Sequence, residues 1–373
     1  MKVHILTGHF YPQIHPRAFR SNELAIEFAK RGYDVTVTNL STTAGFDYEE
    51  YGRANGIKIL NMGLSTNTPT SDTVKPFKRS FVGRTLAFLR NYLMAGSLLF
   101  TSKTIRDRLQ IDEDTDLIIA LSTPFKCILG LSYYLRKKKS MKMVAIADSG
   151  DPFYYSKQYK RAPWFASIEK KAYQQYDYLT IPVESAIPSY NKLISVEKIK
   201  IIPQGFRMDN VKLYKGELPA VTNFAYAGVF YWDIRNPEFL FKYLNSLDLD
   251  FKFHIYMRFP DSILEEMLNQ YSNLKQKVEV HFSVPREQLL YELSMMHFLV
   301  NINNKSNTQI PSKIIDYGIT GRPIFSCNKE TFTPSKLDSF MSGNYTDKME
   351  FDISKYDIVN IVNEFMSLYQ EKR

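Results

Sequence analysis

The stretch KVHILTGHFYPQIHPRAFRSNELAIEFAKRGYDVTVTNL, residues 2–40, decides the fold. It opens with an apolar strand. A segment from Arg17 to Arg31 follows with apolar residues at helical spacing, and Gly32 stands where helices often end. Residues 33–40 then form a second apolar strand. Because strand, helix and strand follow one another within so short a stretch, we predict a parallel βαβ unit.

The same alternation continues along the chain and predicts an α/β protein. Apolar strands alternate with helical patterns as far as residue 184, and a second alternating series starts at residue 223. At 373 residues the chain exceeds a typical single domain. We therefore predict two Rossmann-like parallel-sheet domains, residues 1–190 and 191–357, with a C-terminal helix of about 358–373 packing back on the first. Ligands of such sheets bind beyond the carboxyl ends of the strands.

Composition indicates a globular protein of a reducing compartment. Hydrophobic residues make up 44% of the chain and charged residues 23%. The two cysteines, Cys127 and Cys327, lie in apolar segments and are expected to be buried thiols. The chain shows no secretory signal and no apolar run of transmembrane length, so we expect a cytoplasmic protein.

The net charge of +9 comes from the first half of the chain. Residues 1–190 hold 26 Lys and Arg against 17 Asp and Glu, whereas the remainder holds 22 of each kind. The positive electrostatic field of such a half favours binding to an anionic surface, for instance that of a membrane. A basic face that serves only solubility is an equal alternative. No recognised nucleic-acid motif accompanies the charges, so we expect no nucleic-acid partner. The excess gathers at Lys75, Lys78, Arg79, Arg84, Arg90 and residues 136–139.

The segment IPSKIIDYGITGRPIFSC, residues 310–327, is the strongest candidate for a ligand site. It is read as a polar turn, a short helix, a Gly-Arg-Pro turn and an apolar strand. Lys313 and Asp316 lie three residues apart and share one face of the helix. A helix N-terminus suits a phosphate, so Ser312 and Lys313 would meet phosphates and Asp316 the hydroxyls of a ribose. The alternative is a surface helix with a solvated ion pair.

Four segments of the chain carry a resemblance to a known family. They are residues 9–39, the turn IIPQGF, the stretch YAGVFYWDIRNPEFL and the stretch QIPSKIIDYGITGRPIFS. In this order and spacing they resemble the retaining glycosyltransferases of the GT-B fold, in particular glycosyltransferase family 4 with its "glycosyl transferases group 1" domain. The first segment is similar to the family's opening loop, helix and strand, and the second to the start of its second domain. The third is similar to its phosphate-binding loop and the fourth to its nucleotide-ribose motif, so the resemblance covers nearly the whole chain.

The resemblance implies two domains that face each other across a cleft, the first for the acceptor and the second for the donor. The implied reaction transfers a sugar, with retention, from a nucleotide-diphosphate sugar to a glycan or lipid-linked acceptor. Bacterial surface polysaccharide synthesis is the implied context, at the inner face of the plasma membrane. The implied chemistry needs no cofactor and no essential metal. The Asp-Leu-Asp at residues 248–250 resembles the metal-binding acid pair of another transferase fold, but we interpret it as a loop.

The resemblance also assigns roles to particular residues. Cations must stabilise the leaving diphosphate, and a glycine at a strand end lets a ligand approach the backbone. The glycines, histidines and aspartates concerned also have plain structural alternatives. A glycine can simply form a turn, a histidine can be structural, and an aspartate can stabilise a turn with its own side chain. The catalytic candidates are Asp148, Asp151, Arg235 and Lys313; the donor-binding candidates are Gly8, Arg17, Gly228, Phe230, Arg235, Pro311, Ser312, Lys313 and Asp316; the acceptor-binding candidates are His9 and His15.

The chain departs from the family pattern at several positions. Val229 replaces the usual arginine after the glycine, with Arg235 as the substitute cation. Asp316 replaces the usual glutamate, and Thr308 its paired acid. These departures leave the alternative that the chain is a catalytically degenerate protein that binds a sugar nucleotide or acts as a scaffold. A nucleotide-sugar epimerase of the same fold is less favoured, because the dense set of acids and histidines that it needs is missing.

Overall fold

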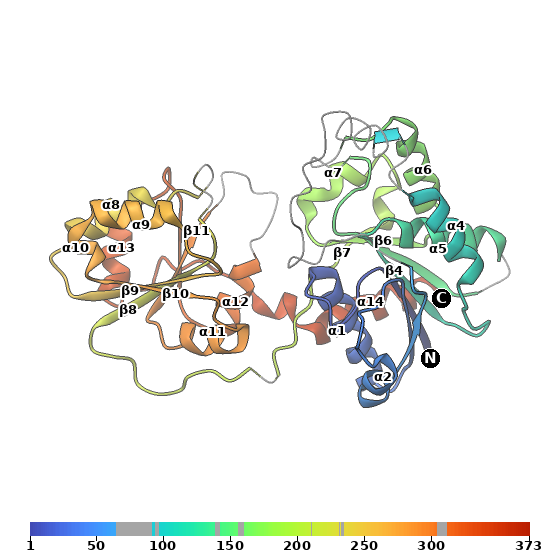
Figure 1. Cartoon of the computed structure of the whole chain (residues 1–373), viewed down its shortest axis with the longest axis horizontal. Helices are drawn as coiled ribbons and strands as arrows, with labels where there is room; N and C mark the ends of the chain where they lie inside the picture. The colour runs from blue at the N-terminus through green and yellow to red at the C-terminus, as the bar shows by residue number, and fades with distance from the viewer. Residues whose placement is uncertain are drawn as a thin grey trace. The chain divides into compact units, whose positions relative to one another are not determined.

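The computed structural model describes residues 1–64, 92–93, 97–138, 142–155, 160–209, 211–230, 232, 235–303 and 312–373. The chain divides into two compact units (Figure 1). The first comprises Met1–Arg207 together with Tyr356–Arg373, and the second comprises Met208–Lys355. Each unit is described by itself.

The first unit is built on a seven-stranded parallel sheet in the order β3-β2-β1-β4-β5-β6-β7. The order reverses between β1 and β4, which is where open α/β sheets bind ligands. Residues of β4 are buried on both faces, as expected for a parallel sheet covered on both sides. The strands are β1 (Lys2–Thr7), β2 (Asp34–Asn39), β3 (Ile57–Asn61), β4 (Leu117–Leu121), β5 (Val144–Asp148), β6 (Tyr178–Ile181) and β7 (Ile199–Ile201).

Helices cover both faces of this sheet, because alternate strand residues point to opposite sides. Leu117 and Ile119 pack with Phe28, on the face that the final helix also covers, whereas Ile118 packs with Ile128 on the other. Figure 1 shows the two helical layers. The first layer holds α1 (Pro16–Lys30), α2 (Tyr48–Asn55) and α14 (Ile358–Lys372), and the second holds α4 (Leu98–Arg108), α5 (Lys126–Lys137), α6 (Trp164–Tyr173) and α7 (Ile187–Tyr190).

The second unit is built on a five-stranded parallel sheet in the order β10-β9-β8-β11-β12, which reverses between β8 and β11. Phenylalanines form its centre: the ring centroids of Phe224 and Phe253 lie 4.7 Å apart, as do those of Phe224 and Phe298. The strands are β8 (Thr222–Ala227), β9 (Phe251–Met257), β10 (Val278–Phe282), β11 (Phe298–Ile302) and β12 (Ile324–Cys327). The helices are α8 (Glu238–Ser246), α9 (Ser262–Gln270), α10 (Ser272–Lys275), α11 (Arg286–Leu293), α12 (Ser312–Thr320) and α13 (Pro334–Met341).

The first unit extends to Arg207, whereas the sequence prediction ended the first domain at residue 190. The difference arises because residues 199–201 pair with β6 as the last strand of the first sheet. The last helix belongs to the first unit: Arg31 of α1 donates to Asn363 at 2.7 Å and to the carbonyl of Val359 at 2.6 Å. Among the described residues, no helix is long and apolar enough to cross a bilayer.

Several predictions concern residues outside the described part of the chain. The basic positions from Lys75 to Arg90 belong to this group, as do Thr308 and Pro311. The sequence also has a helical pattern over residues 83–109, and within it the structure describes α4 from Leu98 to Arg108. Ser312 is described as the first residue of α12, without its side chain.

Candidate functional site

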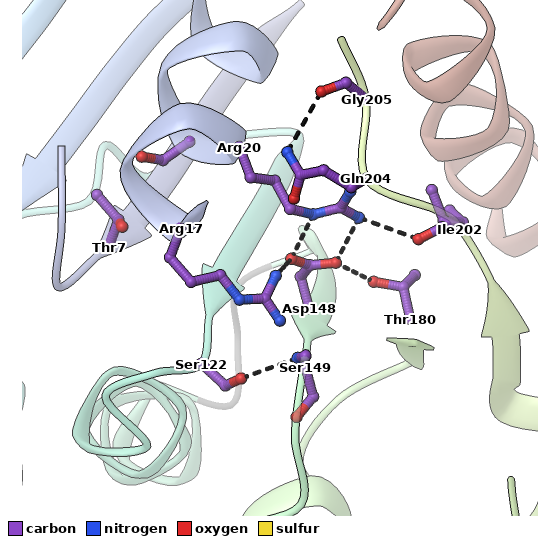
Figure 2. Close-up of polar contacts among 12 residues, drawn as sticks. Thr7, Arg17, Arg20, Ser122, Asp148, Ser149, Thr180, Ile202, Gln204 and Gly205 are labelled. Atoms are coloured by element: carbon purple, nitrogen blue, oxygen red, sulfur yellow. Dashed lines mark hydrogen bonds and ion pairs between the residues drawn. The ribbon is translucent and has the colours of Figure 1, made fainter. Parts of the chain in front are cut away.

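The carboxylate of Asp148 lies at the centre of a buried polar cluster at the carboxyl end of β5 (Figure 2). Its side chain is 2% exposed, and both of its oxygens are engaged. Arg20 donates to it from Nε and from Nη2, each at 2.7 Å. Arg17 donates from Nη1 at 2.9 Å, and the Thr180 hydroxyl donates at 2.7 Å. Asp148 therefore fixes two arginines of α1 at the carboxyl edge of the first sheet.

The cluster keeps an excess of positive charge. Burial alone would raise the pKa of Asp148, but Arg20 and Arg17 beside it, with hydrogen bonds from Arg20 and Thr180, lower that pKa overall. The carboxylate is thus ionised at neutral pH and neutralises one of the two guanidinium charges. The remaining charge is available to an anion.

Arg17 also keeps a donor unused. Its Nη2 is buried and has no hydrogen-bond partner among the described residues. The same atom lies beside Gly150, where an added Cβ would come within 2.0 Å of it. A buried donor without a partner costs about 1–3 kcal/mol. Such a donor, on a guanidinium held in place by Asp148, is poised for an acceptor that the described residues do not supply.

Two stacked histidines lead into α1, with their ring centroids 4.2 Å apart. Nδ1 of His15 accepts from the backbone N–H of Arg17 at 3.2 Å and caps the helix. Nδ1 of His9 and Oε1 of Gln13 lie 2.8 Å apart. Burial lowers the pKa of both histidines, that of His15 to about 4. Both rings are therefore neutral near pH 7, and hydrogen bonding at Nδ1 leaves Nε2 of each for a ligand.

Gly8 follows β1 at the point where the strand order reverses. A Cβ at this position would lie 2.0 Å from Cδ of Pro124, which follows β4. The structure therefore explains this glycine by the close packing of two loops, and an approach of ligand to Gly8 stays a prediction. The other acidic candidate of this unit, Asp151, is exposed, and its carbonyl accepts from the hydroxyl of Ser149 at 3.2 Å.

Sequence reasoning missed three residues of the first unit that shape this site. Arg20 lies one helical turn after Arg17, so its spacing was an available signal. Thr180 reaches Asp148 from the neighbouring strand, which only the sheet order reveals. Buried Glu169 accepts from the backbone N–H groups of Phe153 and Tyr154, at 2.7 and 2.8 Å, and so holds the segment after Asp151.

In the second unit, α12 carries an ion-pair cluster centred on Asp316. The side chain of Asp316 is 9% exposed and lies 3.1 Å from Nζ of Lys313. Nη2 of Arg286, the first residue of α11, lies 2.9 Å from its other oxygen. The predicted shared face of Lys313 and Asp316 is thus observed. Arg286 lies thirty residues away in the chain, so no local pattern announced it.

Tyr317 ties α12 to the end of β8. Its hydroxyl accepts from the backbone N–H of Ala227 at 2.7 Å. The next residue, Gly228, has a φ of +154°, a conformation that residues with a Cβ rarely adopt. Phe230 is 2% exposed and stacks on Tyr226 at 4.4 Å between centroids. The structure therefore places Phe230 in the core, where its ring packs against protein; a contact of this residue with donor stays a prediction.

A pocket of about 450 Å³ opens at the carboxyl edge of the second sheet. Its lining residues follow three strands: Arg235 comes after β8, Asn303 after β11 and Lys329 after β12. Trp232 and Phe239 supply aromatic surface. The pocket spans the reversal of strand order between β8 and β11, which is the expected ligand position in an open α/β sheet.

No family model matches the chain, and no curated protein matches it in sequence. Solved structures do match. The apo form of WaaB, a lipopolysaccharide outer core galactosyltransferase, is 14% identical over 100% of both chains, with a TM-score of 0.59. A glycosyltransferase from Rickettsia africae is 10% identical over 100% of this chain and 98% of its own, with a TM-score of 0.62. HepE of Anabaena, in complex with UDP, is 10% identical over 100% of both chains, with a TM-score of 0.57.

These matches define the class of fold. The matched structures are those of GT-B glycosyltransferases, and the chain shares their two parallel-sheet α/β units. The predicted GT-B fold class is therefore confirmed. Membership of glycosyltransferase family 4 stays a prediction, because identities of 10–14% establish the fold alone.

Proposed function

We propose that the protein is a glycosyltransferase that moves a sugar, with retention of configuration, from a nucleotide-diphosphate sugar to a glycan or lipid-linked acceptor. The observation that carries the proposal is the pocket at the reversal of strand order in the second sheet, at the carboxyl edge from which the chain continues through α12 after β11. A nucleotide needs a phosphate-binding element and a ribose acceptor, and α12 offers both at one sheet edge.

In this proposal Lys313 and the backbone N–H groups at the start of α12 hold the diphosphate, and Asp316 accepts from the ribose. Because Asp316 also binds Arg286 and Lys313, ribose binding exchanges or shares those contacts. Arg235 in the pocket supplies a further cation for the charge that develops on the leaving diphosphate. Gly228 lets the backbone after β8 approach the phosphates.

The first unit receives the acceptor. The buried Nη2 of Arg17 is proposed to bind an anionic oxygen of the donor, the role predicted for it from the sequence, and Asp148 keeps that guanidinium in place. Nε2 of neutral His9 and His15 provides hydrogen bonds for acceptor hydroxyls. Exposed Asp151 adds a carboxylate at the same sheet edge. We propose no protein nucleophile.

The solved structures suggest which donor to test first. HepE was solved with UDP and with UDP-glucose, and TarM of S. aureus with alpha-GlcNAc-glycerol and UDP. We therefore propose a UDP-sugar as the donor and a surface polysaccharide precursor as the acceptor. The reaction is proposed to need no metal and no other cofactor.

We further propose that the protein works in the cytoplasm at the inner face of the plasma membrane. Exposed apolar side chains occur beside basic ones on α4, where Phe100 is 77% exposed and Lys103 and Arg106 follow. Trp164 at the start of α6 is 50% exposed. Apolar groups that insert beside cations that attract anionic lipid are the two elements of peripheral binding.

The direct test is release of the leaving nucleotide from a panel of donors, namely UDP, GDP or ADP from the corresponding diphosphate sugars and CMP from CMP-sugars. Lipid-phosphate glycans serve as acceptors, with or without EDTA. We expect turnover of one donor class, unchanged by EDTA, and a product whose anomeric proton coupling matches that of the donor. Binding without turnover of any donor would favour the degenerate scaffold. Release of an isomerised free sugar nucleotide would favour the epimerase.

A further inference from the structure

Two histidines and a glutamate come together on the face of the second sheet that α11 covers, at its β9–β10 edge. In the parallel register Glu279 of β10 stands opposite His254 of β9, and His281 stands opposite Tyr256. Side chains two residues apart on a strand share a face, so His254, Glu279 and His281 project to the same side. This cluster has no role in the function proposed above.

The spacing of the three side chains fits a metal ion. Nδ1 of His254 lies 3.1 Å from Nε2 of His281 and 3.5 Å from Oε2 of Glu279. The three candidate ligand atoms all lie within 4.8 Å of one another. A tetrahedral Zn²⁺ with bonds of 2.0–2.2 Å separates its ligand atoms by about 3.3 Å. The two measured distances lie on either side of that value.

Neighbouring side chains orient two of the three groups, Glu279 and His281. Nζ of Lys252 lies 2.9 Å from Oε1 of Glu279, which leaves Oε2 turned toward His254. The ring of Tyr256 stacks on His281 at 4.5 Å between centroids. His254 is 9% exposed, and its Nε2 is a buried nitrogen without a partner in the described part of the chain. Coordination through Nδ1 places the proton on Nε2 and defines the tautomer.

We propose that His254, Glu279 and His281 bind a late first-row divalent cation, with Zn²⁺ as the best fit, and that water completes the tetrahedron. Two imidazoles and one carboxylate suit zinc better than Mg²⁺ or Ca²⁺, which take oxygen ligands. The ion joins the edge strand β10 to β9 and thereby stabilises the exposed edge of the second sheet. It is separate from the transfer chemistry.

The test is titration of the purified metal-free protein with Zn²⁺ against a chromophoric chelator, with Co²⁺ absorption in the visible range as the geometric probe. We expect one Zn²⁺ per chain, a rise in melting temperature, and the intense absorption of four-coordinate Co²⁺. Glu279→Gln, at an exposed position where the fold tolerates the change, is expected to weaken binding at least roughly tenfold. His254→Gln with His281→Gln is expected to abolish it.

His297→Gln is the matched control, because it removes a histidine of the same unit that lies outside the cluster and contacts Asn223 instead. It is expected to leave Zn²⁺ affinity unchanged. Equal binding by the wild type, Glu279→Gln and the double histidine variant would overturn the proposal, as would weak octahedral Co²⁺ absorption. Because the readouts are metal affinity and stability, they do not depend on transferase activity.

Discussion

Replacing Asp148 by asparagine removes the only carboxylate that the structure shows on Arg17 and Arg20, among the residues that it describes. Both guanidinium groups stay buried, so the charge of the cluster rises from one excess positive charge to two. Breaking a buried ion pair from one side costs about 3–5 kcal/mol. The oxygen of the new amide can still accept from Thr180, so that hydrogen bond is kept and adds no further cost. We therefore expect the free energy of unfolding of the first unit to fall by an amount within that range.

Urea unfolding followed by tryptophan fluorescence can isolate the first unit. The chain has two tryptophans, Trp164 in the first unit and Trp232 in the second. A Trp232→Phe background therefore leaves Trp164 as a reporter of the first unit alone. Asp107→Asn is the matched control, because this aspartate pairs with Arg106 on the surface, and it should leave the midpoint unchanged.

The pH dependence gives a second readout of the same prediction. Since the pKa of Asp148 is lowered in the folded state, its stabilisation is present above the unfolded-state value of about 3.9 and is lost as pH falls through the folded value. Asp148→Asn should therefore lose less stability on acidification than the parent. A variant within about 1 kcal/mol of the parent at pH 7 would refute the claim that the carboxylate offsets the two arginines.

Three further predictions test other parts of the account. Gly8→Ala brings a Cβ within 2.0 Å of Pro124 and should destabilise the first unit by about 1–3 kcal/mol in urea unfolding; an unchanged midpoint would contradict the close loop packing. Burial raises the pKa of Glu169 to about 7, so stability should fall by roughly 3 kcal/mol as pH rises from about 4.5 to 7; a Glu169→Gln variant that keeps this slope would contradict it. Phe100→Ser should weaken co-sedimentation with anionic vesicles, whereas Phe259→Ser, at a 64% exposed position of the second unit, should not; equal losses would argue against docking through α4.

Most helices and strands were predictable from the local sequence pattern, because their apolar residues recur at the period of a helix or a strand. The short helix predicted within residues 310–327 spans Ser312–Thr320, and the helix predicted from Arg17 to Arg31 spans Pro16–Lys30. The sheet membership of residues 199–201 was not predictable. A three-residue strand carries no sign of which sheet it joins, and pairing with β6 is a long-range choice.

The sequence named candidate site residues, but it did not show their contacts. Asp148 was predicted as a catalytic residue, and in the structure both of its oxygens accept hydrogen bonds from arginines and a threonine. Whether it also contacts the reacting centre stays a prediction. Partners such as Arg286 approach from elements far away in sequence, and spacing along the chain cannot reveal such pairs.

The central claim is that α12 and the pocket at the carboxyl edge of the second sheet bind a nucleotide-diphosphate sugar. Calorimetric titration of the purified protein with UDP and UDP-glucose tests it most directly, alongside Lys313→Ala and the control Lys336→Ala, which removes an exposed lysine of α13. Loss of a charge-assisted hydrogen bond costs about 1.5–3 kcal/mol, so Lys313→Ala should bind roughly 10- to 100-fold more weakly while the control binds like the parent. Equal affinities of all three proteins, or no binding of any nucleotide sugar in a wider panel, would contradict the account.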